Sequence, residues 1–275
     1  RGLGNAHDLV GRYFMEHLEM PSGQLALTGE RAPSTVMYAF EFGRTKARGE
    51  LALSAAKQRE QRMLNATVSL QPTTTAEQEV LSTFQRMTPE RLEAYRKWDE
   101  GGRVGPLSIG LPPARADTVV GPPRMFDLLT RQEQAPNPAS RVTLGREHDA
   151  LGMPRATLDW RLTSLDRRSF RAFYEVLGRE LGRSGVGRVR MNDWVTSTEE
   201  SWPASTGGGW HHMGTTRMHD DPKQGVVDAN CRVHGIGNLS VAGASVYPTA
   251  GCANPTLTLV ALSLRLSDRL KTALG

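Results

Sequence analysis

The sequence predicts a mixed α+β fold in which an antiparallel sheet is combined with amphipathic helices. Runs of alternating β-forming residues recur through residues 1–205, and stretches with helical spacing separate them. Residues 206–275 differ, because they are rich in Gly and His and end in a single helix. The chain has 275 residues, of which 38% are hydrophobic, so it can bury a large core.

Five stretches carry the pattern of half-buried strands, because β-branched and aromatic residues alternate in them with polar ones. They cover residues 34–40, 66–72, 140–145, 155–162 and 187–194. The third and fourth are separated by a charged connection that contains Gly and Pro, so we expect them to pair antiparallel. A further strand is predicted over residues 239–249, whose small residues Gly243, Ala244 and Ser245 let a bulky cofactor approach the main chain.

Helices are predicted where strong helix formers dominate or where apolar residues fall on one helical face. They cover residues 6–19, 45–62, two segments within 73–100, one short helix near Met125 in an irregular Gly- and Pro-rich region, and residues 163–185. Either Thr163 or Ser164 can cap the helix over 163–185. The residues expected to bury the last helix are Leu257, Val260, Ala261 and Leu264.

Charge and composition argue against several classes of function. The net charge of +5 comes mostly from scattered arginines without a run of like charges, which argues against a nucleic-acid-binding protein. No apolar run approaches the about 20 residues of a membrane span, and the opening residues lack the apolar core of a signal peptide, so a cytoplasmic protein is expected. Cys231 and Cys252 form no C-x-x-C pair and are expected to stay reduced. His7 and His17 are assigned to the surface or the core.

Two features of the carboxy-terminal region point to chemistry. His211 and His212 stand between Gly209 and Gly214, where small neighbours let the backbone approach a ligand. Asn254-Pro255-Thr256 is a favourable helix start, with Asn as the cap and Pro in the first turn. Such a start presents unpaired N–H groups and the positive end of the helix dipole, which suit a ligand with negative charge. The histidines of this region lack the spacing of a zinc site, so no metal is expected.

Four short motifs follow one another in this region: His211-His212-Met213-Gly214-Thr215, Val226-Val227-Asp228, Arg232-Val233-His234-Gly235, and Pro248-Thr249 ahead of Asn254. In this order they resemble the H-x-x-G-T, V-V-D, R-V-x-G and P-T elements of the glucose-methanol-choline (GMC) oxidoreductases. The wording PTAGCANPTLT is most similar to members with Asn at the second catalytic position, as in pyranose oxidase. The resemblance is strong over residues 206–275 and extends to the opening segment 2–17.

The resemblance implies an FAD-dependent oxidoreductase that acts on the CH–OH group of an alcohol or sugar. His211 would be the base that removes the hydroxyl proton while hydride passes to flavin N5, since histidine can be neutral and basic near pH 7. Asn254 would hold the substrate oxygen, and Trp210 with His211 would contact the substrate. The FAD contacts would come from Gly243, Ala244, Asn254, Pro255 and Thr256. Taken alone, His211 can be structural, Asn254 a plain helix cap, and Trp210 a packing residue.

The same resemblance divides the chain into three parts. Residues 1–22 and 206–275 would belong to the FAD domain, and residues 23–205 would form the substrate-binding domain with a mostly antiparallel sheet. No G-x-G-x-x-G turn stands between a strand and a helix, so the Rossmann-like α/β FAD domain is expected to be partial. We therefore expect the carboxy-terminal half of an enzyme that works with a separate amino-terminal portion. The alternative is a non-catalytic fragment or subunit. Neither the substrate nor the electron acceptor has a sequence signature.

Overall fold

Five antiparallel strands form the main sheet of the structure, a computed structural model that describes residues 2–28, 40–42, 45–47, 49–72, 125–199 and 201–275. The strands lie in the spatial order β4 (Leu51–Ala52), β5 (Ala66–Pro72), β6 (Met125–Gln132), β1 (Leu18–Leu27) and β9 (Gly187–Met191). Each neighbouring pair is antiparallel. Every second side chain of β6 is buried, as expected for a sheet with one covered face. The predicted α+β fold with an antiparallel sheet is confirmed.

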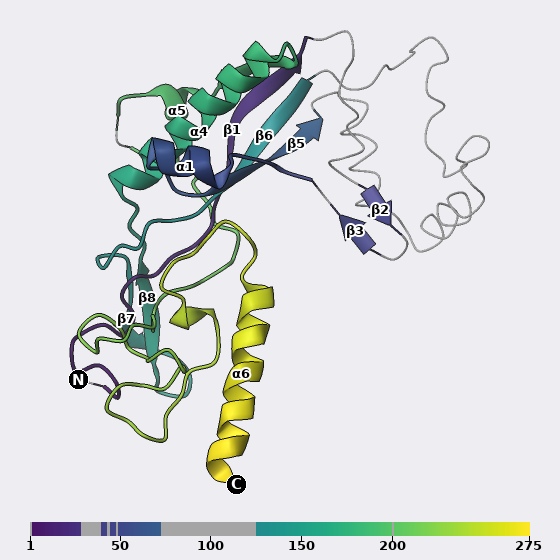
Figure 1. Ribbon diagram of the computed structural model, residues 1–275. Helices are drawn as coiled ribbons and strands as arrows, with labels where there is room; N and C mark the ends of the chain where they lie inside the picture. The colour runs from purple at the N-terminus through teal and green to yellow at the C-terminus, as the bar shows by residue number, and fades with distance from the viewer. Residues whose placement is uncertain (1, 29–39, 43–44, 48, 73–124, 200) are drawn as a thin grey trace, which may run out of the picture.

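A layer of helices covers one face of this sheet. The long helix α4 (Ser164–Arg183) lies across the strands, with α1 (Ala55–Gln61) and the short α5 (Asp193–Thr196) nearby (Figure 1). The two layers meet where Phe173 and Tyr174 of α4 join the buried side chains of the strands. We call this cluster the sheet core; its buried members are Leu25, Leu27, Ala66, Val68, Phe126, Leu128, Phe173, Tyr174, Leu177 and Val195.

Local sequence explains where α4 begins. The hydroxyl of Thr163 accepts the N–H of Asp166, and the carboxylate of Asp166 accepts the N–H of Thr163 at 2.6 Å, which is a capping box. Of the two predicted caps, Thr163 is the one used. Asp166 also accepts the N–H of Ala135 at 2.7 Å, and burial raises the pKa of this carboxyl while its hydrogen bonds act in the opposite direction. The cap therefore ties α4 to the chain that leaves β6.

Two hairpins lie outside the main sheet. β7 (Arg141–His148) pairs antiparallel with β8 (Pro154–Asp159), which confirms the predicted pairing of residues 140–145 with 155–162. Most side chains of this hairpin are exposed. The second hairpin consists of β2 (Phe40–Phe42) and β3 (Thr45–Ala47).

The opening and carboxy-terminal segments form a second core. Met15 and Met213 exchange backbone hydrogen bonds of 3.0 and 2.9 Å, so the two segments run next to each other. Apart from isolated bridges, residues 201–275 contain only the 3-10 helix η2 (Ala244–Val246) and α6 (Thr256–Leu274), which stands along the side of this core (Figure 1). We call the cluster the terminal core; its buried members are Met15, Met213, Val226, Val227, Cys231, Val233, Val246, Tyr247, Ala250 and Leu266.

Three predicted elements are wrong in type. Residues 6–19 are not a helix, because Asp8 and Tyr13 have positive φ angles that interrupt a right-handed helix. Met125 begins strand β6, in which apolar side chains alternate into the sheet core, rather than lying in a helix. Residues 239–249 form turns and η2 instead of a strand, and Gly243 there has a φ of 136° that no strand adopts.

Other predictions differ in extent. The helix predicted over 45–62 is shorter, because β3 and β4 occupy its first part and α1 starts only after the Ser54 cap. The strand predicted over 187–194 ends at Met191, where α5 follows, and the strand over 66–72 is confirmed as β5. The predictions for residues 34–39 and 73–124 lie outside the described residues. Within the described ranges, no helix combines the length and hydropathy that a membrane crossing requires.

Candidate active site

A buried carboxylate from the opening segment holds the backbone of His211. Oε1 of Glu16 accepts the backbone N–H of His211 at 2.7 Å and that of His17 at 2.8 Å. Its other carboxylate oxygen lies 3.3 Å from Nε2 of His212. Because the Glu16 side chain is buried, these contacts fix both histidine-bearing segments at one point.

The rings of His17 and His211 are in direct contact. Their Nδ1 atoms are 2.9 Å apart, and the rings meet edge to face with centroids 4.8 Å apart. His17 is fully buried, and this burial lowers the pKa of its ring to about 4, with the neighbouring His211 as the second cause. His17 is therefore uncharged at neutral pH, so one Nδ1 donates and the other accepts.

Neighbouring side chains leave no room for a Cβ atom at Gly208 and Gly209. A Cβ on Gly208 would lie 2.2 Å from Cγ of Glu16, and one on Gly209 would lie 2.6 Å from Oε1 of Glu19. The sequence analysis expected a ligand close to the backbone at Gly209, whereas the side chain of Glu19 occupies the space beside it. Trp210, which follows with a φ of 61°, is 86% exposed, so it does not pack into a core.

The turn that carries Gly243 and Ala244 lies beside the segment that follows His211. The carbonyl of Ala244 accepts the N–H of Gly214 at 3.4 Å, and that of Ser245 accepts the N–H of Thr216 at 2.8 Å. At Gly243 the backbone is left-handed, with a φ of 136°, and a Cβ built there meets nothing within 4 Å. The main chain at Gly243 is therefore open to a flat ligand, and only glycine adopts this conformation without strain.

The start of α6 differs from the predicted helix start by one residue. The first helical residue is Thr256, and Pro255 occupies the cap position, where its carbonyl accepts the N–H of Leu259 at 2.9 Å and the hydroxyl of Tyr247 at 2.8 Å. No side chain caps this end, so the prediction that Asn254 is the helix cap is wrong. The Asn254 side chain is exposed instead.

The backbone of the segment before Asn254 lies next to His17. The N–H of Gly251 is held at 3.1 Å by Glu133, whose second oxygen accepts the N–H of Asn65 at 3.2 Å. The backbone of Ala250 faces the ring of His17 and acts against the lowering of its pKa. His17 thus stands between His211 and the turn before Asn254. In the described residues, His211 and Asn254 share no hydrogen bond.

Sequence reasoning missed three residues that organise this site: Glu16, His17 and Glu133. Their partners lie far along the chain, and the only signal for the first two was the likeness of the opening segment to the GMC pattern. The cysteines are both buried and free, and burial raises the pKa of Cys252 with help from the nearby acidic Glu133. Among the described residues, no three His, Cys, Asp or Glu side chains gather as a metal site requires.

His17, His211 and the buried carboxylate of Glu16 thus form one connected cluster of side chains. Residues 136–263 match the sequence profile of the family described as GMC oxidoreductase. The matched stretch is just under half of the chain, and it agrees with the family that the ordered motifs resemble.

Several named proteins are similar in sequence to parts of this chain. The chain is 28% identical over 179 residues to the fructose dehydrogenase large subunit of Gluconobacter japonicus, a stretch that covers 63% of this chain and 31% of that protein. It is 35% identical over 132 residues to C-glycoside 3-oxidase of Arthrobacter globiformis, which covers 46% and 24%. It is 29% identical over 147 residues to pyranose 2-oxidase of Emericella nidulans, which covers 50% and 23%. The matched stretch is thus less than a third of each of these relatives.

Proposed function

We propose that this chain supplies the substrate domain and the catalytic end of an FAD-dependent oxidoreductase that acts on the CH–OH group of an alcohol or sugar. The contact between His17 and His211, held by buried Glu16, is the observation that carries the proposal. The names of the relatives point to the same chemistry, since fructose dehydrogenase and pyranose 2-oxidase are named for the oxidation of sugars.

His211 is the base in this proposal. His17 is neutral, and in this proposal its proton is on Nε2, because Nδ1 faces His211; Nε2 is buried and has no hydrogen-bond partner among the described residues. Nδ1 of His17 then accepts the Nδ1–H of His211 across the 2.9 Å contact. This tautomer leaves Nε2 of His211 without a proton, ready to take the proton of a substrate hydroxyl. His17 is a positioning residue because it acts through His211.

Asn254 is proposed to bind the substrate oxygen. Its amide is a donor that does not titrate, so it can hold the oxygen before and after the proton leaves. The Asn254 side chain is exposed and does not cap α6, so its amide is available to a ligand. Trp210, which is also exposed, is proposed to contact the substrate together with His211. An Asn rather than a His at the second catalytic position would then resemble the arrangement of pyranose oxidase.

The residues expected to hold FAD fit a flat, anionic group. Gly243 presents open main chain and Ala244 follows it in η2, while the N–H groups of α6 before Leu259, including that of Thr256, have no partner within the helix. We propose that these groups, with Asn254 and Pro255, contact the flavin. When bound, FAD would accept the hydride that leaves the substrate carbon.

A separate amino-terminal portion of the FAD domain is the proposed partner. α6 exposes an apolar stripe of Leu257, Val260, Ala261 and Leu264, although this stripe was expected to be buried. Leu257 is 83% exposed and Leu264 is 62% exposed, and such a stripe indicates a surface that another chain segment covers. The alternative, a non-catalytic subunit, predicts that the same surface is covered without flavin reduction. The three-part domain division and the cytoplasmic location stay predictions of the sequence.

The experiment compares two variants in the chain combined with its amino-terminal portion and FAD. Replacing His211 by Ala should slow reduction of the flavin by a sugar or primary alcohol about 10²–10⁴-fold, because a positioned base is lost. The matched control is His212→Ala, whose ring contacts the other carboxylate oxygen of Glu16 and which should change the rate less than about tenfold. Stopped-flow absorbance of the flavin measures both rates. Equal losses in the two variants would refute the assignment, and an unreduced flavin in the unchanged complex would favour the non-catalytic alternative.

A further inference from the structure

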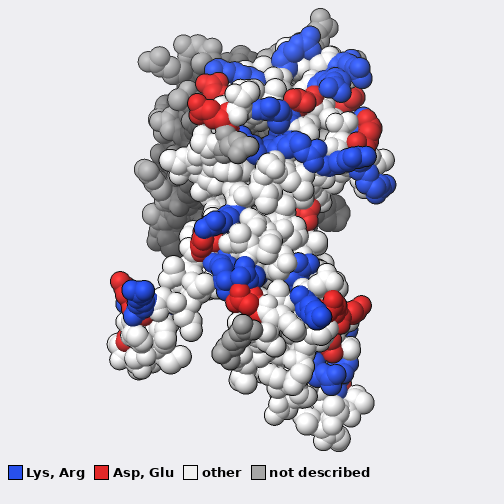
Figure 2. Space-filling model, turned by 90° about the vertical axis from the view of Figure 1, so that its left-hand side faces the viewer, with Lys and Arg blue, Asp and Glu red and all other residues white. Residues whose placement is uncertain are grey.

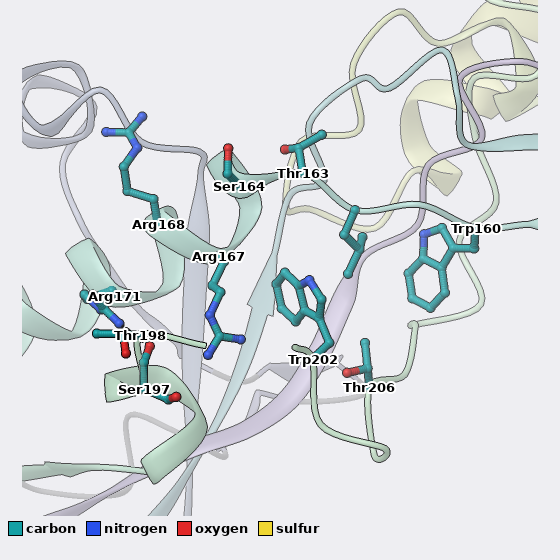
Figure 3. A pocket seen from close by; sticks show the side chains of 11 residues that line it. Trp160, Thr163, Ser164, Arg167, Arg168, Arg171, Ser197, Thr198, Trp202 and Thr206 are labelled. Atoms are coloured by element: carbon teal, nitrogen blue, oxygen red, sulfur yellow. Dashed lines mark hydrogen bonds between the residues drawn. The ribbon is translucent and has the colours of Figure 1, made fainter. Parts of the chain in front are cut away.

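A cavity separate from the histidine site opens at the start of α4. It has a volume of about 640 Å³ and lies between the beginning of α4, the chain that follows β8, and residues 197, 198, 202 and 206. Figure 3 shows Arg167 and Arg171 pointing toward Ser197 and Thr198, while Arg168 points away from them. Because neither His211 nor Asn254 lines this cavity, it is a different site from the one described above.

Two arginines form its cationic wall. Arg167 donates from Nη1 to the carbonyl of Ser201 and from Nη2 to that of Trp194, each at 2.6 Å. Arg171 donates from Nε and Nη2 to the carbonyls of residues 195, 196 and 197. These bonds fix both guanidinium groups in place. They leave the Nη1 donors of Arg171 and the Nε–H of Arg167 without a partner among the described residues.

The positive charge of this wall is not neutralised by an acidic side chain in the described part of the chain. Neither Arg167 nor Arg171 forms an ion pair there. The nearby carboxylate of Glu199 accepts instead from the hydroxyl of Ser201 at 3.4 Å. Figure 2 shows a band of Lys and Arg side chains across one face, at the height of α4 in Figure 1.

Aromatic rings complete the cavity beside these cations. The guanidinium of Arg167 lies 5.8 Å from the ring centre of Trp202. In Figure 3 the rings of Trp160 and Trp202 stand next to Thr206, on the side away from Arg171. The indole N–H of Trp160 donates to Gln134 at 2.9 Å, which fixes that ring as well. Prearranged donors at one end and flat apolar faces at the other suit a ligand with an anionic group on a ring.

We propose that this cavity binds an oxyanion carried on a sugar ring, such as a sugar phosphate or a sugar carboxylate. The anion would accept hydrogen bonds from the free donors of Arg167 and Arg171, and the ring would stack on the tryptophans. The inference goes beyond the proposed oxidation and is independent of FAD. It is tested by binding alone, so its failure is distinguishable from a failure of the proposed function.

The test is calorimetric titration of the purified chain with glucose 6-phosphate, glucuronate, glucose and inorganic phosphate. At least one of the two anionic sugars should bind about tenfold or more tightly than glucose and than inorganic phosphate, because charge-assisted bonds and ring contact act together. The preferred anionic sugar identifies the oxyanion. Equal binding of glucose and the anionic sugars, or no binding of either anionic sugar, would overturn the proposal.

Variants locate the site. Arg171→Gln should lose the preference for the anionic sugar, whereas Arg179→Gln should keep it, because Arg179 lies on the exposed part of the same helix and outside the cavity. Arg171 also holds backbone, so a second variant is needed that does not disturb the fold. Thr198→Asp places a competing carboxylate at an exposed position of the wall and should abolish the preference with an unchanged melting temperature. Retention of the preference in a folded Thr198→Asp variant would refute the site.

Discussion

The sheet core and the terminal core are built in different ways. In the sheet core, α4 and the main sheet bury each other's apolar faces, and regular elements account for most of the contacts. In the terminal core, turns and isolated bridges join distant segments, and α6 leaves an apolar stripe uncovered. The proposed catalytic residues lie in the second region, which is the less regular of the two and has an exposed apolar flank. Such a division is common when a rigid scaffold carries functional loops.

The largest expected loss of stability comes from breaking the sheet core. Phe173→Ala removes a fully buried ring from the contact between α4 and the sheet, so the free energy of unfolding should fall by about 3–5 kcal/mol. Leu144→Ala on the exposed β7–β8 hairpin is the control and should change it by about 0.5 kcal/mol or less. Urea unfolding followed by circular dichroism measures both. Similar losses at the two positions would contradict the description of the sheet core.

The folded chain should lose stability in acid through His17, which lies outside both hydrophobic cores. Because the pKa of His17 is lowered from about 6.5 to about 4 in the folded state, the folded chain disfavours the protonated ring. This contribution to the free energy of unfolding is therefore fully present above pH 6.5, decreases as the pH falls, and is lost once the pH has fallen through 4. The total loss is about 3 kcal/mol. Urea unfolding at several pH values in this window, compared between the unchanged chain and His17→Gln, measures the effect. If the variant keeps the full acid sensitivity, His17 is not its source.

The smallest effect is expected on the open flank of α6. Leu264 is 62% exposed, so Leu264→Ala should change the free energy of unfolding of the isolated chain by about 0.5 kcal/mol or less. Leu266 on the same helix is only 8% exposed, and Leu266→Ala should cost about 2–3 kcal/mol. In the presence of the proposed amino-terminal portion, Leu264→Ala should weaken binding of that portion, which a pull-down or titration measures. Unchanged binding would remove the stripe from the proposed interface.

Local sequence determined the elements whose signals are short in range. The Thr163 cap and the apolar stripe through Phe173 predicted α4, and alternation predicted the β7–β8 hairpin. The ordered motifs from His211 to Asn254 pointed to the family whose profile matches residues 136–263, because they depend on residue identity and order rather than on folding. The helix and the hairpin can be predicted from sequence because each depends on residues that lie close together along the chain.

Only the tertiary structure decided how the site is assembled. His17 and His211 lie 194 positions apart in sequence, and the backbone pairing of Met15 with Met213 brings them into contact. That pairing draws the opening segment out of the helix its composition favoured, since long-range hydrogen bonds and burial outweigh a weak local preference. Leucines lie on several sides of α6, and the face of Leu257 and Leu264 that was expected to be buried is exposed, whereas Leu266 is buried. Burial depends on what packs against a surface, and packing is decided by residues far away along the chain.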